Sequence, residues 1–350
     1  MLLKDFSFDL PEYLIATKPA FPRDSSKLLY LLSRDQYEET QFSRICDYLL
    51  PGDILVTNDT KVNTSKIIGL NKEGNRKVEF TFISNEKKGI WLCFALPGKK
   101  VHEGSFFLFK GVEGKIIKKN SEEIFIDFDD KNNDFTAVLR SYGKISLPPY
   151  ISKFRSLDES DNENYQTVYA KKNGSVAAPT AGLHFTESLL NKIKAMNIDI
   201  ESVTLNIGPG TFLPLRSEKI RDNTLHSEKF FISEETAKSL NNAYKNKNRR
   251  IISVGTTSLR VLESAFDNKS LFKSLSSSTD IFIYPGKKIK SINGLITNFH
   301  LPRSSLFLLI CALVGTKTAL DMYNFAIKNK YRFYSYGDAC FLLNKNYDKI

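Results

Sequence analysis

Three of the four histidines in this chain lie in short segments rich in Gly, Pro, Thr, Asn and Ser, all in the second half of the sequence. Such segments make poor helices and poor central strands, because glycine and proline interrupt both hydrogen-bond ladders. A histidine titrates near neutral pH, and loops that carry one are frequent at catalytic and anion-binding sites. We therefore predict that His184, His226 and His300 line one shared pocket, where one of them transfers protons.

Each of these histidines has a polar neighbour close by in the sequence that can orient its ring or tune its pKa, namely Thr180, Glu228 and Asn298. No Gly-x-Ser-x-Gly segment is present, which argues against an acyl-transfer triad. The four cysteines include no Cys-x-x-Cys pair, so reduced thiols are expected and a metal site is not.

The segment Gly255-Thr-Thr-Ser258 follows a β-branched run and precedes a helical pattern. A strand-to-helix turn of this kind presents N–H groups and hydroxyls at a helix N-terminus, where a phosphate or carboxylate binds. A simple hydroxyl cap for the helix is the alternative interpretation. Arg260, on the same helix, either adds a bidentate carboxylate contact or pairs with Glu263 at i+3.

A glycine-rich turn precedes this segment in the sequence. Gly208, Gly210 and Thr211 can form a backbone concavity that a flat ligand approaches closely, with Phe212 stacked on the ligand. A plain turn followed by a core phenylalanine explains the same residues nearly as well.

The elements that must position these segments fall into two patterns. Residues from about 67 to 128 form short branched or aromatic runs separated by turn residues, which predicts a small antiparallel barrel or sandwich. From Tyr165 onward strands alternate with helices, which predicts an α/β layer with a mostly parallel sheet and ligands at the carboxyl ends of its strands. We expect strands at 203–207, 251–254 and 281–284, and helices after Thr186 and Ser233 and at 259–266, 306–314 and 319–327. Residues 152–164 are expected to form a flexible loop.

The bulk composition indicates a folded protein with a basic surface. A chain of 350 residues exceeds a typical single core, so two domains are expected. The net charge of +11 suits a nucleic-acid partner, although a sequence rich in Lys and Asn is also typical of an A+T-biased gene. No apolar run reaches the roughly 18 residues of a membrane span and the N-terminus is acidic, so we expect a cytoplasmic protein without membrane contact. We also expect a monomer.

Taken in order, the motifs resemble the S-adenosylmethionine:tRNA ribosyltransferase-isomerase family of queuosine biosynthesis. Pro51-Gly-Asp53, Asn58-Asp-Thr60 and Leu147-Pro-Pro-Tyr150 extend the likeness toward the N-terminus. The eight main segments lie at residues 165–169, 177–185, 208–212, 226–228, 254–258, 281–286, 297–302 and 331–338.

The resemblance implies an α/β main domain with a mixed, largely parallel sheet, interrupted by an inserted small antiparallel β-barrel. We place the main domain at residues 1–62 and 148–350 and the barrel at 63–147. It also implies a reaction in which the ribosyl unit of S-adenosylmethionine is moved onto the aminomethyl group of a 7-deazaguanine at the tRNA wobble position and isomerised, with release of adenine and methionine. S-adenosylmethionine is then a consumed substrate, and no cofactor or metal is expected.

For that reaction the sequence offers a set of catalytic and binding residues. A sulfonium acidifies the hydrogens on the ribose 5′ carbon, so His184, His226 or His300 is expected to act as base, with Glu228 or Asp338 orienting it or holding the aminomethyl group. Aromatic faces can attract the sulfonium, and residues 255–260 can bind the methionine carboxylate or a tRNA phosphate. The predicted substrate-binding residues are Thr180, Gly182, Phe185, Gly208, Gly210, Thr211, Phe212, Thr256, Thr257, Ser258, Arg260, Asn298 and Tyr336.

The chain departs from the family pattern at three positions. Asn206 stands where a histidine is common, Arg303 where an acidic residue is common, and Lys61 where an arginine is usual. Asparagine cannot exchange a proton at pH 7, which motivates an alternative function: a tRNA-binding relative with weakened catalysis. A methyltransferase is a third option, but the early Gly-rich strand–loop–helix of that class is missing.

Overall fold

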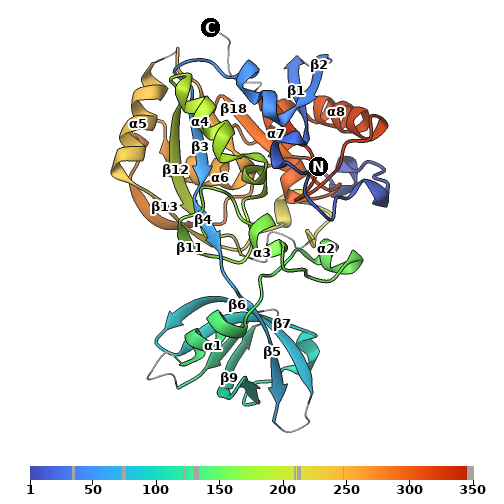
Figure 1. The fold of residues 1–350 in the computed structure, drawn as a ribbon, viewed down its shortest axis with the longest axis vertical. Coiled ribbons are helices and arrows are strands. Elements are labelled where there is room, and N and C mark those ends of the chain that lie inside the picture. The colour runs from blue at the N-terminus through green and yellow to red at the C-terminus, as the bar shows by residue number, and fades with distance from the viewer. Residues whose placement is uncertain are drawn as a thin grey trace.

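The computed structural model describes residues 1–33, 36–72, 76–120, 123–129, 134–208, 210, 214–246 and 248–344. Figure 1 shows two bodies: a large one that holds both ends of the described chain, and a smaller barrel below it, which two segments of the chain join to the large body. The described termini both belong to the large body, so the barrel is an insertion within it.

The large body is built on a nine-stranded mixed sheet. Its central pairings, β12·β3, β3·β14 and β14·β18, are parallel, as is β1·β19, whereas the remaining pairings are antiparallel. The predicted α/β main domain with a mixed, largely parallel sheet is therefore confirmed, and most of the parallel pairings lie at its centre. The strands in sheet order are β17 (Leu275–Thr279), β13 (Glu228–Ile232), β12 (Asp199–Leu205), β3 (Ile54–Asn58), β14 (Ile251–Val254), β18 (Gly294–Asn298), β19 (Ala339–Leu343), β1 (Lys27–Ser33) and β2 (Gln36–Gln41).

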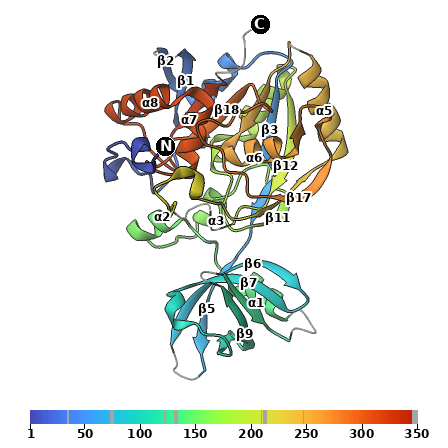
Figure 2. The same ribbon diagram turned by 180° about the vertical axis from the view of Figure 1, so that it is seen from behind.

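Helices bury both faces of this sheet, which explains why its central strands are apolar throughout. Along β3, Ile54 and Val56 belong to one core cluster and Leu55 to the other, as expected for side chains that alternate between faces. α4 (Glu187–Ala195) lies on the face turned to the viewer in Figure 1, and α6 (Gly255–Ala265) lies on the face seen in Figure 2.

Local capping signals fix where the helices begin. Thr186, Ser233 and Ser304 each accept a hydrogen bond from the backbone N–H three residues later, at the starts of α4, α5 (Glu234–Lys245) and α7 (Ser305–Val314). α8 (Thr316–Lys328) follows α7 directly. Within the described chain no single helix is long and apolar enough to cross a membrane, and α7 with α8 would qualify only as a pair bent by 115°.

The inserted body is a closed antiparallel barrel, which confirms the predicted architecture. Phe80, Phe82, Phe107 and Phe109 fill its interior, and Phe135 of α1 (Asp134–Tyr142) packs against them. The domain boundaries at 62/63 and 147/148 stay a prediction. The strands are β5 (Lys66–Asn71), β6 (Lys77–Lys87), β7 (Ile90–Leu96), β8 (Phe106–Phe109), β9 (Val112–Asn120) and β10 (Glu123–Asp127).

Two short two-stranded sheets complete the description. β4 (Thr60–Val62) pairs with β11 (Lys172–Ser175) beside the junction with the barrel, and β15 (Phe266–Asp267) pairs with β16 (Leu271–Phe272).

Three local predictions were wrong. α6 begins at Gly255 rather than Leu259, so the threonine segment is the first turn of the helix instead of a preceding loop. Residues 281–284 form no strand. β17 ends before them, at Thr279, and the side chains of Phe282 and Ile283 pack into the core. Residues 152–164 contain the end of α2 (Pro149–Phe154) and all of α3 (Asp161–Asn164), and they are tied down by a buried ion pair between Asp161 and Arg155.

Candidate active site

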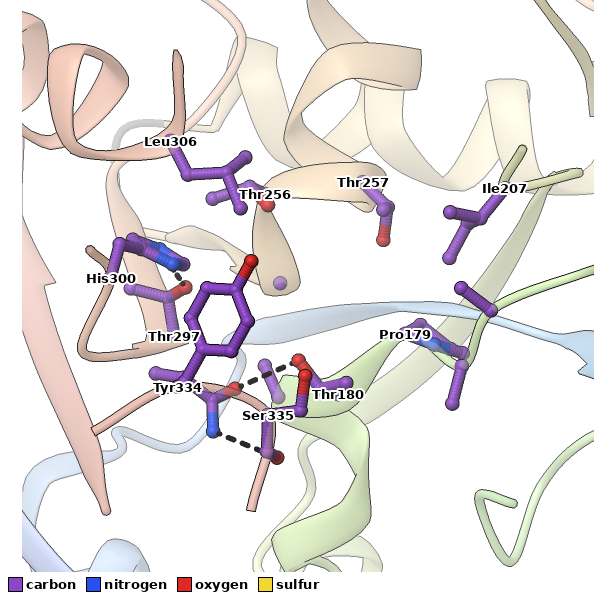
Figure 3. Close-up of a pocket in the computed structure, with 15 residues that line it drawn as sticks. Pro179, Thr180, Ile207, Thr256, Thr257, Thr297, His300, Leu306, Tyr334 and Ser335 are labelled. Carbon is purple, nitrogen blue, oxygen red and sulfur yellow. Dashed lines mark hydrogen bonds between the residues drawn. The ribbon is translucent and has the colours of Figure 1, made fainter. Parts of the chain in front are cut away.

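The polar segments converge at the carboxyl ends of β14 and β18, where a mixed sheet is expected to bind ligands. They form a cleft that we call the threonine cleft, which opens to solvent (Figure 3). Its lining residues come from five separate stretches of the chain: residues 177–181, Ile207, residues 255–257, residues 297–306 and residues 334–335.

His300 lies in the wall of this cleft. Its Nε2 is 3.1 Å from the Thr297 hydroxyl, and its backbone N–H donates to the Tyr323 hydroxyl. The side chain is almost fully buried, and desolvation of the charged form lowers the pKa of the imidazole from 6.5 to about 3. His300 is therefore a neutral imidazole at pH 7, held at a fixed angle beside the space that a ligand would occupy.

A hydrogen-bonded chain of side chains runs from the cleft floor into the core. Thr180 donates to the Asn298 amide oxygen at 3.3 Å, and the Asn298 amide nitrogen lies 3.2 Å from His184 Nε2. His184 Nδ1 is in turn 2.8 Å from the Ser26 hydroxyl, and the ring stacks on Phe42. Burial lowers the pKa of His184 to about 4, so this imidazole is also neutral at pH 7. With both ring nitrogens engaged, His184 lies behind Asn298 and orients it.

Tyr334 and Ser335 line the same cleft and were not singled out from the sequence. Tyr334 has a φ of 76°, a left-handed conformation that is rare for a bulky residue, and its N–H donates to Phe299 O at 2.8 Å. Such backbone conformations gather at functional sites. The aromatic segment 331–338 signalled the region, but the residues chosen within it, Tyr336 and Asp338, are not the ones that face the cleft.

A second cleft, which we call the arginine cleft, adjoins the first. It shares Thr256, Thr257 and Leu306 with the threonine cleft. Its other lining residues are Gly210, Leu225, His226, Glu228, Arg260, Ile281, Phe282, Ile283, Ser305 and Leu309.

The arginine cleft is centred on an ion pair between Arg260 and Glu228, both of them at least nine-tenths buried. Glu228 also accepts the Gly208 N–H at 2.9 Å, and Arg260 Nε donates to Ile281 O. The carboxylate partner of Arg260 is therefore Glu228 and not Glu263. Glu263 Oε1 instead accepts hydrogen bonds from the N–H groups of residues 290 and 291. The pair joins residues 32 positions apart, which helical spacing cannot predict.

His226 differs from the other two histidines because it is exposed. It lies against Gly210, where an added Cβ would come within 2.5 Å of its ring, and its ring makes an edge contact with Phe94 of the barrel. His226 therefore stands at the junction between the barrel and the arginine cleft.

Three predicted binding residues lie outside both clefts because they pack inside the molecule. Phe185 is fully buried between Phe42 and Tyr169. Gly182 lies so close to the Tyr169 hydroxyl that an added Cβ would collide with it. Ser258 donates to Val254 O within its own helix. We place no ligand contact on these residues.

Tyr336 and Asp338 also lie away from the two clefts. The Tyr336 hydroxyl donates to Asp161, which already forms the ion pair with Arg155. Asp338 is buried and accepts hydrogen bonds from the backbone and guanidinium of Arg332 and from the Lys27 N–H. Asp338 therefore organises the 331–338 segment and is not available to hold an aminomethyl group. Thr211 and Phe212 fall outside the described residues.

Asn206 lies at the edge of the site. Its amide oxygen accepts from the Thr60 hydroxyl at 3.3 Å, and its side chain covers Gly174. The side chain thus fills space between β4 and β11 and does not line either cleft. Arg303, the second departure, forms an exposed ion pair with Glu218. Among the described His, Cys, Asp and Glu side chains no group of three or more could hold a metal ion.

Comparison with known proteins links this geometry to a family. The model of a family described as "Queuosine biosynthesis protein" matches residues 3–342. The chain is 42% identical to an S-adenosylmethionine:tRNA ribosyltransferase-isomerase of Methylocella silvestris, over 98% of both chains. It is 44% identical to the protein of that name from Clostridioides difficile, over 97% of this chain and 99% of the other.

A solved structure resembles the whole molecule. The S-adenosylmethionine tRNA ribosyltransferase of Thermotoga maritima, determined as a crystal structure, superposes with a TM-score of 0.54 at 28% identity. The match covers 97% of this chain and 100% of the Thermotoga chain, so it includes both the sheet body and the inserted barrel.

Proposed function

The chain belongs to the queuosine biosynthesis protein family, and from that premise we propose how its clefts perform the family reaction. Like those relatives, it is an S-adenosylmethionine:tRNA ribosyltransferase-isomerase. We propose that it moves the ribosyl group of S-adenosylmethionine onto the aminomethyl group of a 7-deazaguanine at the tRNA wobble position. Isomerisation then gives epoxyqueuosine-tRNA, and adenine and methionine leave. S-adenosylmethionine is consumed as a substrate and no cofactor takes part.

We assign the role of base to His300. Among the three candidate histidines it alone lines the threonine cleft with a buried, neutral ring. Removing a proton from the carbon next to the sulfonium leaves a neutral sulfonium ylide and a protonated imidazole. The net charge of the cleft is therefore +1 before and after the step, so the transfer adds no charge to the buried site, although burial lowers the pKa of His300 in the free protein. This geometry of His300 is the observation that carries the assignment.

The hydrogen-bonded chain Thr180–Asn298–His184 supports this assignment. Asn298 is held by three partners, since its amide nitrogen also lies 3.4 Å from Ser335 O. A fixed amide in the cleft wall can position a ribose hydroxyl or a base edge without reorganisation. We propose that Asn298 binds the adenosine part of the substrate and that His184 keeps it in place.

The alternative of a tRNA-binding relative with weakened catalysis rested on Asn206. Because the Asn206 side chain contacts Thr60 and Gly174 and lines neither cleft, its failure to titrate does not remove a base from the proposed reaction. We therefore favour the active enzyme. Mass spectrometry of tRNA treated with the protein and S-adenosylmethionine separates the two, because the alternative predicts binding without a gain in mass. A cytoplasmic monomer remains our expectation.

The test of the proposed base compares His300→Gln with His102→Gln, a matched change at an exposed residue of the barrel. Loss of a general base typically lowers a rate by about 10²- to 10⁴-fold. We expect a loss in that range in adenine release for His300→Gln, with the His102→Gln rate unchanged. A wild-type rate in the His300 variant would show that the base lies elsewhere.

A further inference from the structure

Two polar atoms in the arginine cleft are buried without a hydrogen-bond partner among the described residues: Arg260 Nη2 and Thr257 Oγ1. Both residues line the cleft, and Figure 3 shows the Thr257 side chain extending from α6 into the adjoining space. A buried donor that lost its water on folding is costly unless a ligand satisfies it. These atoms therefore mark a place where a polar ligand group binds.

The positive charge beside Arg260 Nη2 and Thr257 Oγ1 favours an anionic ligand group. Arg260 carries a cationic guanidinium, and its other nitrogens are already used, Nη1 by Glu228 and Nε by Ile281 O. α6 begins at Gly255 without a side-chain cap, so the N–H groups of its first turn add positive potential beside Thr257. A planar carboxylate fits a guanidinium edge, a hydroxyl and a helix N-terminus together.

The rest of the cleft indicates that this carboxylate belongs to an amino acid with an apolar side chain. Glu228 places a negative charge beside Arg260, which opposes a dianionic phosphate but attracts the ammonium of an α-amino acid. Leu225, Phe282 and Leu309 provide an apolar wall against which two methylenes and a sulfur can pack.

The two clefts meet at Thr256, Thr257 and Leu306, so one elongated ligand can occupy both. We propose, resting on the function proposed above, that the arginine cleft is the amino-acid subsite for S-adenosylmethionine. Arg260 Nη2 and Thr257 Oγ1 bind the methionine carboxylate, Glu228 compensates the ammonium, and the adenosine lies in the threonine cleft. The sulfonium and the 5′ carbon then lie at the shared wall, on the side of His300.

The decisive experiment compares ligands with and without the carboxylate, and protein variants with and without the groups proposed to bind it. Binding of S-adenosylmethionine and of decarboxylated S-adenosylmethionine is measured by calorimetry for the wild type, Arg260→Lys and Thr257→Val. Arg260→Lys keeps the charge beside Glu228 but removes Nη2, and Thr257→Val keeps the shape of the side chain. Arg44→Lys, an exposed arginine paired with Asp47, is the matched control.

We expect the wild type and the control to bind S-adenosylmethionine about 10- to 100-fold more tightly than the decarboxylated analogue, as for a hydrogen bond to a charged group. Arg260→Lys should lose most of that preference and Thr257→Val part of it, with adenine binding unchanged in both. If Arg260→Lys and Thr257→Val keep the full preference of the wild type, the subsite assignment is wrong while the proposed function stands. A wild type that binds neither compound would instead overturn the proposed function and this assignment with it.

Discussion

At the scale of single residues, two buried histidines make the stability of this protein depend on pH. Burial lowers the pKa of His184 to about 4 and that of His300 to about 3, whereas both titrate near 6.5 in the unfolded chain. Above pH 6.5 both histidines are neutral in the folded and in the unfolded protein, so they do not lower the free energy of unfolding. As the pH falls toward 4, both histidines are protonated in the unfolded chain but stay neutral in the folded protein. The free energy of unfolding therefore decreases by about 1.4 kcal/mol per pH unit for each histidine.

The prediction is that His184→Gln removes about one proton from this pH dependence between pH 6 and 4.5. Urea unfolding at several pH values measures it, because the slope of the unfolding free energy against pH counts protons independently of the absolute stability. His102→Gln should leave the slope as in the wild type. An unchanged slope in the His184 variant would mean that this ring is charged in the folded protein.

At the scale of elements, the start of α6 connects the sheet to both clefts. Gly255 has a φ of +86°, which turns the chain directly from β14 into the helix and aims Thr256 and Thr257 at the site. An alanine in this left-handed conformation costs about 1–2 kcal/mol. We expect Gly255→Ala to lose that much stability in urea unfolding and also to weaken S-adenosylmethionine binding, because any relaxation moves the two threonines.

Gly286 supplies the control for this prediction, since it also has a positive φ, +102°, and lies outside both clefts. Gly286→Ala should lose a similar amount of stability and keep the affinity for S-adenosylmethionine. Equal losses of affinity in the two variants would indicate a general effect of destabilisation rather than a role for the helix start.

At the scale of the whole molecule, β4 and β11 lie at the lower edge of the sheet body, on the side of the barrel (Figure 1), and this edge carries exposed lysines that we call the basic strip. Lys61 on β4 and Lys171 and Lys172 at β11 are exposed, and Lys172 lies 4.0 Å above the ring of Phe231. β11 leads directly into the residues 177–181 that line the threonine cleft. A tRNA phosphate backbone bound along this strip would bring an anticodon base to the cleft.

We expect the affinity for tRNA to fall steeply between about 50 and 200 mM salt, because phosphate contacts release counterions. Lys61→Ala with Lys171→Ala should reduce the slope of log affinity against log salt by about two. Lys328→Ala, at the end of α8 on the part of the body remote from the barrel, is the control. Filter binding at several salt concentrations checks this, and a slope equal to that of the wild type in the double variant would place the tRNA elsewhere.

Features that depend on neighbouring residues could be predicted without the fold. The short branched or aromatic runs separated by turn residues predicted the barrel, Thr186 and Ser233 predicted two helix starts, and the collinear motifs led to the family. The barrel and helix-start signals each lie within a few neighbouring residues, and the family signal needs only the order of short motifs along the chain, so none of them requires knowledge of contacts in the folded protein.

Which polar residues line a cleft depends on contacts that exist only in the folded protein. His184 has a side chain suited to catalysis, but both of its ring nitrogens are hydrogen-bonded, to Ser26 and Asn298 from distant segments. Asp338 is hydrogen-bonded to the nearby Arg332. The pairing of Arg260 with Glu228 likewise depends on how α6 packs against β13. The physical reason is that a side chain's role depends on whether folding leaves it a partner, and most such partners come from distant segments brought together by the sheet.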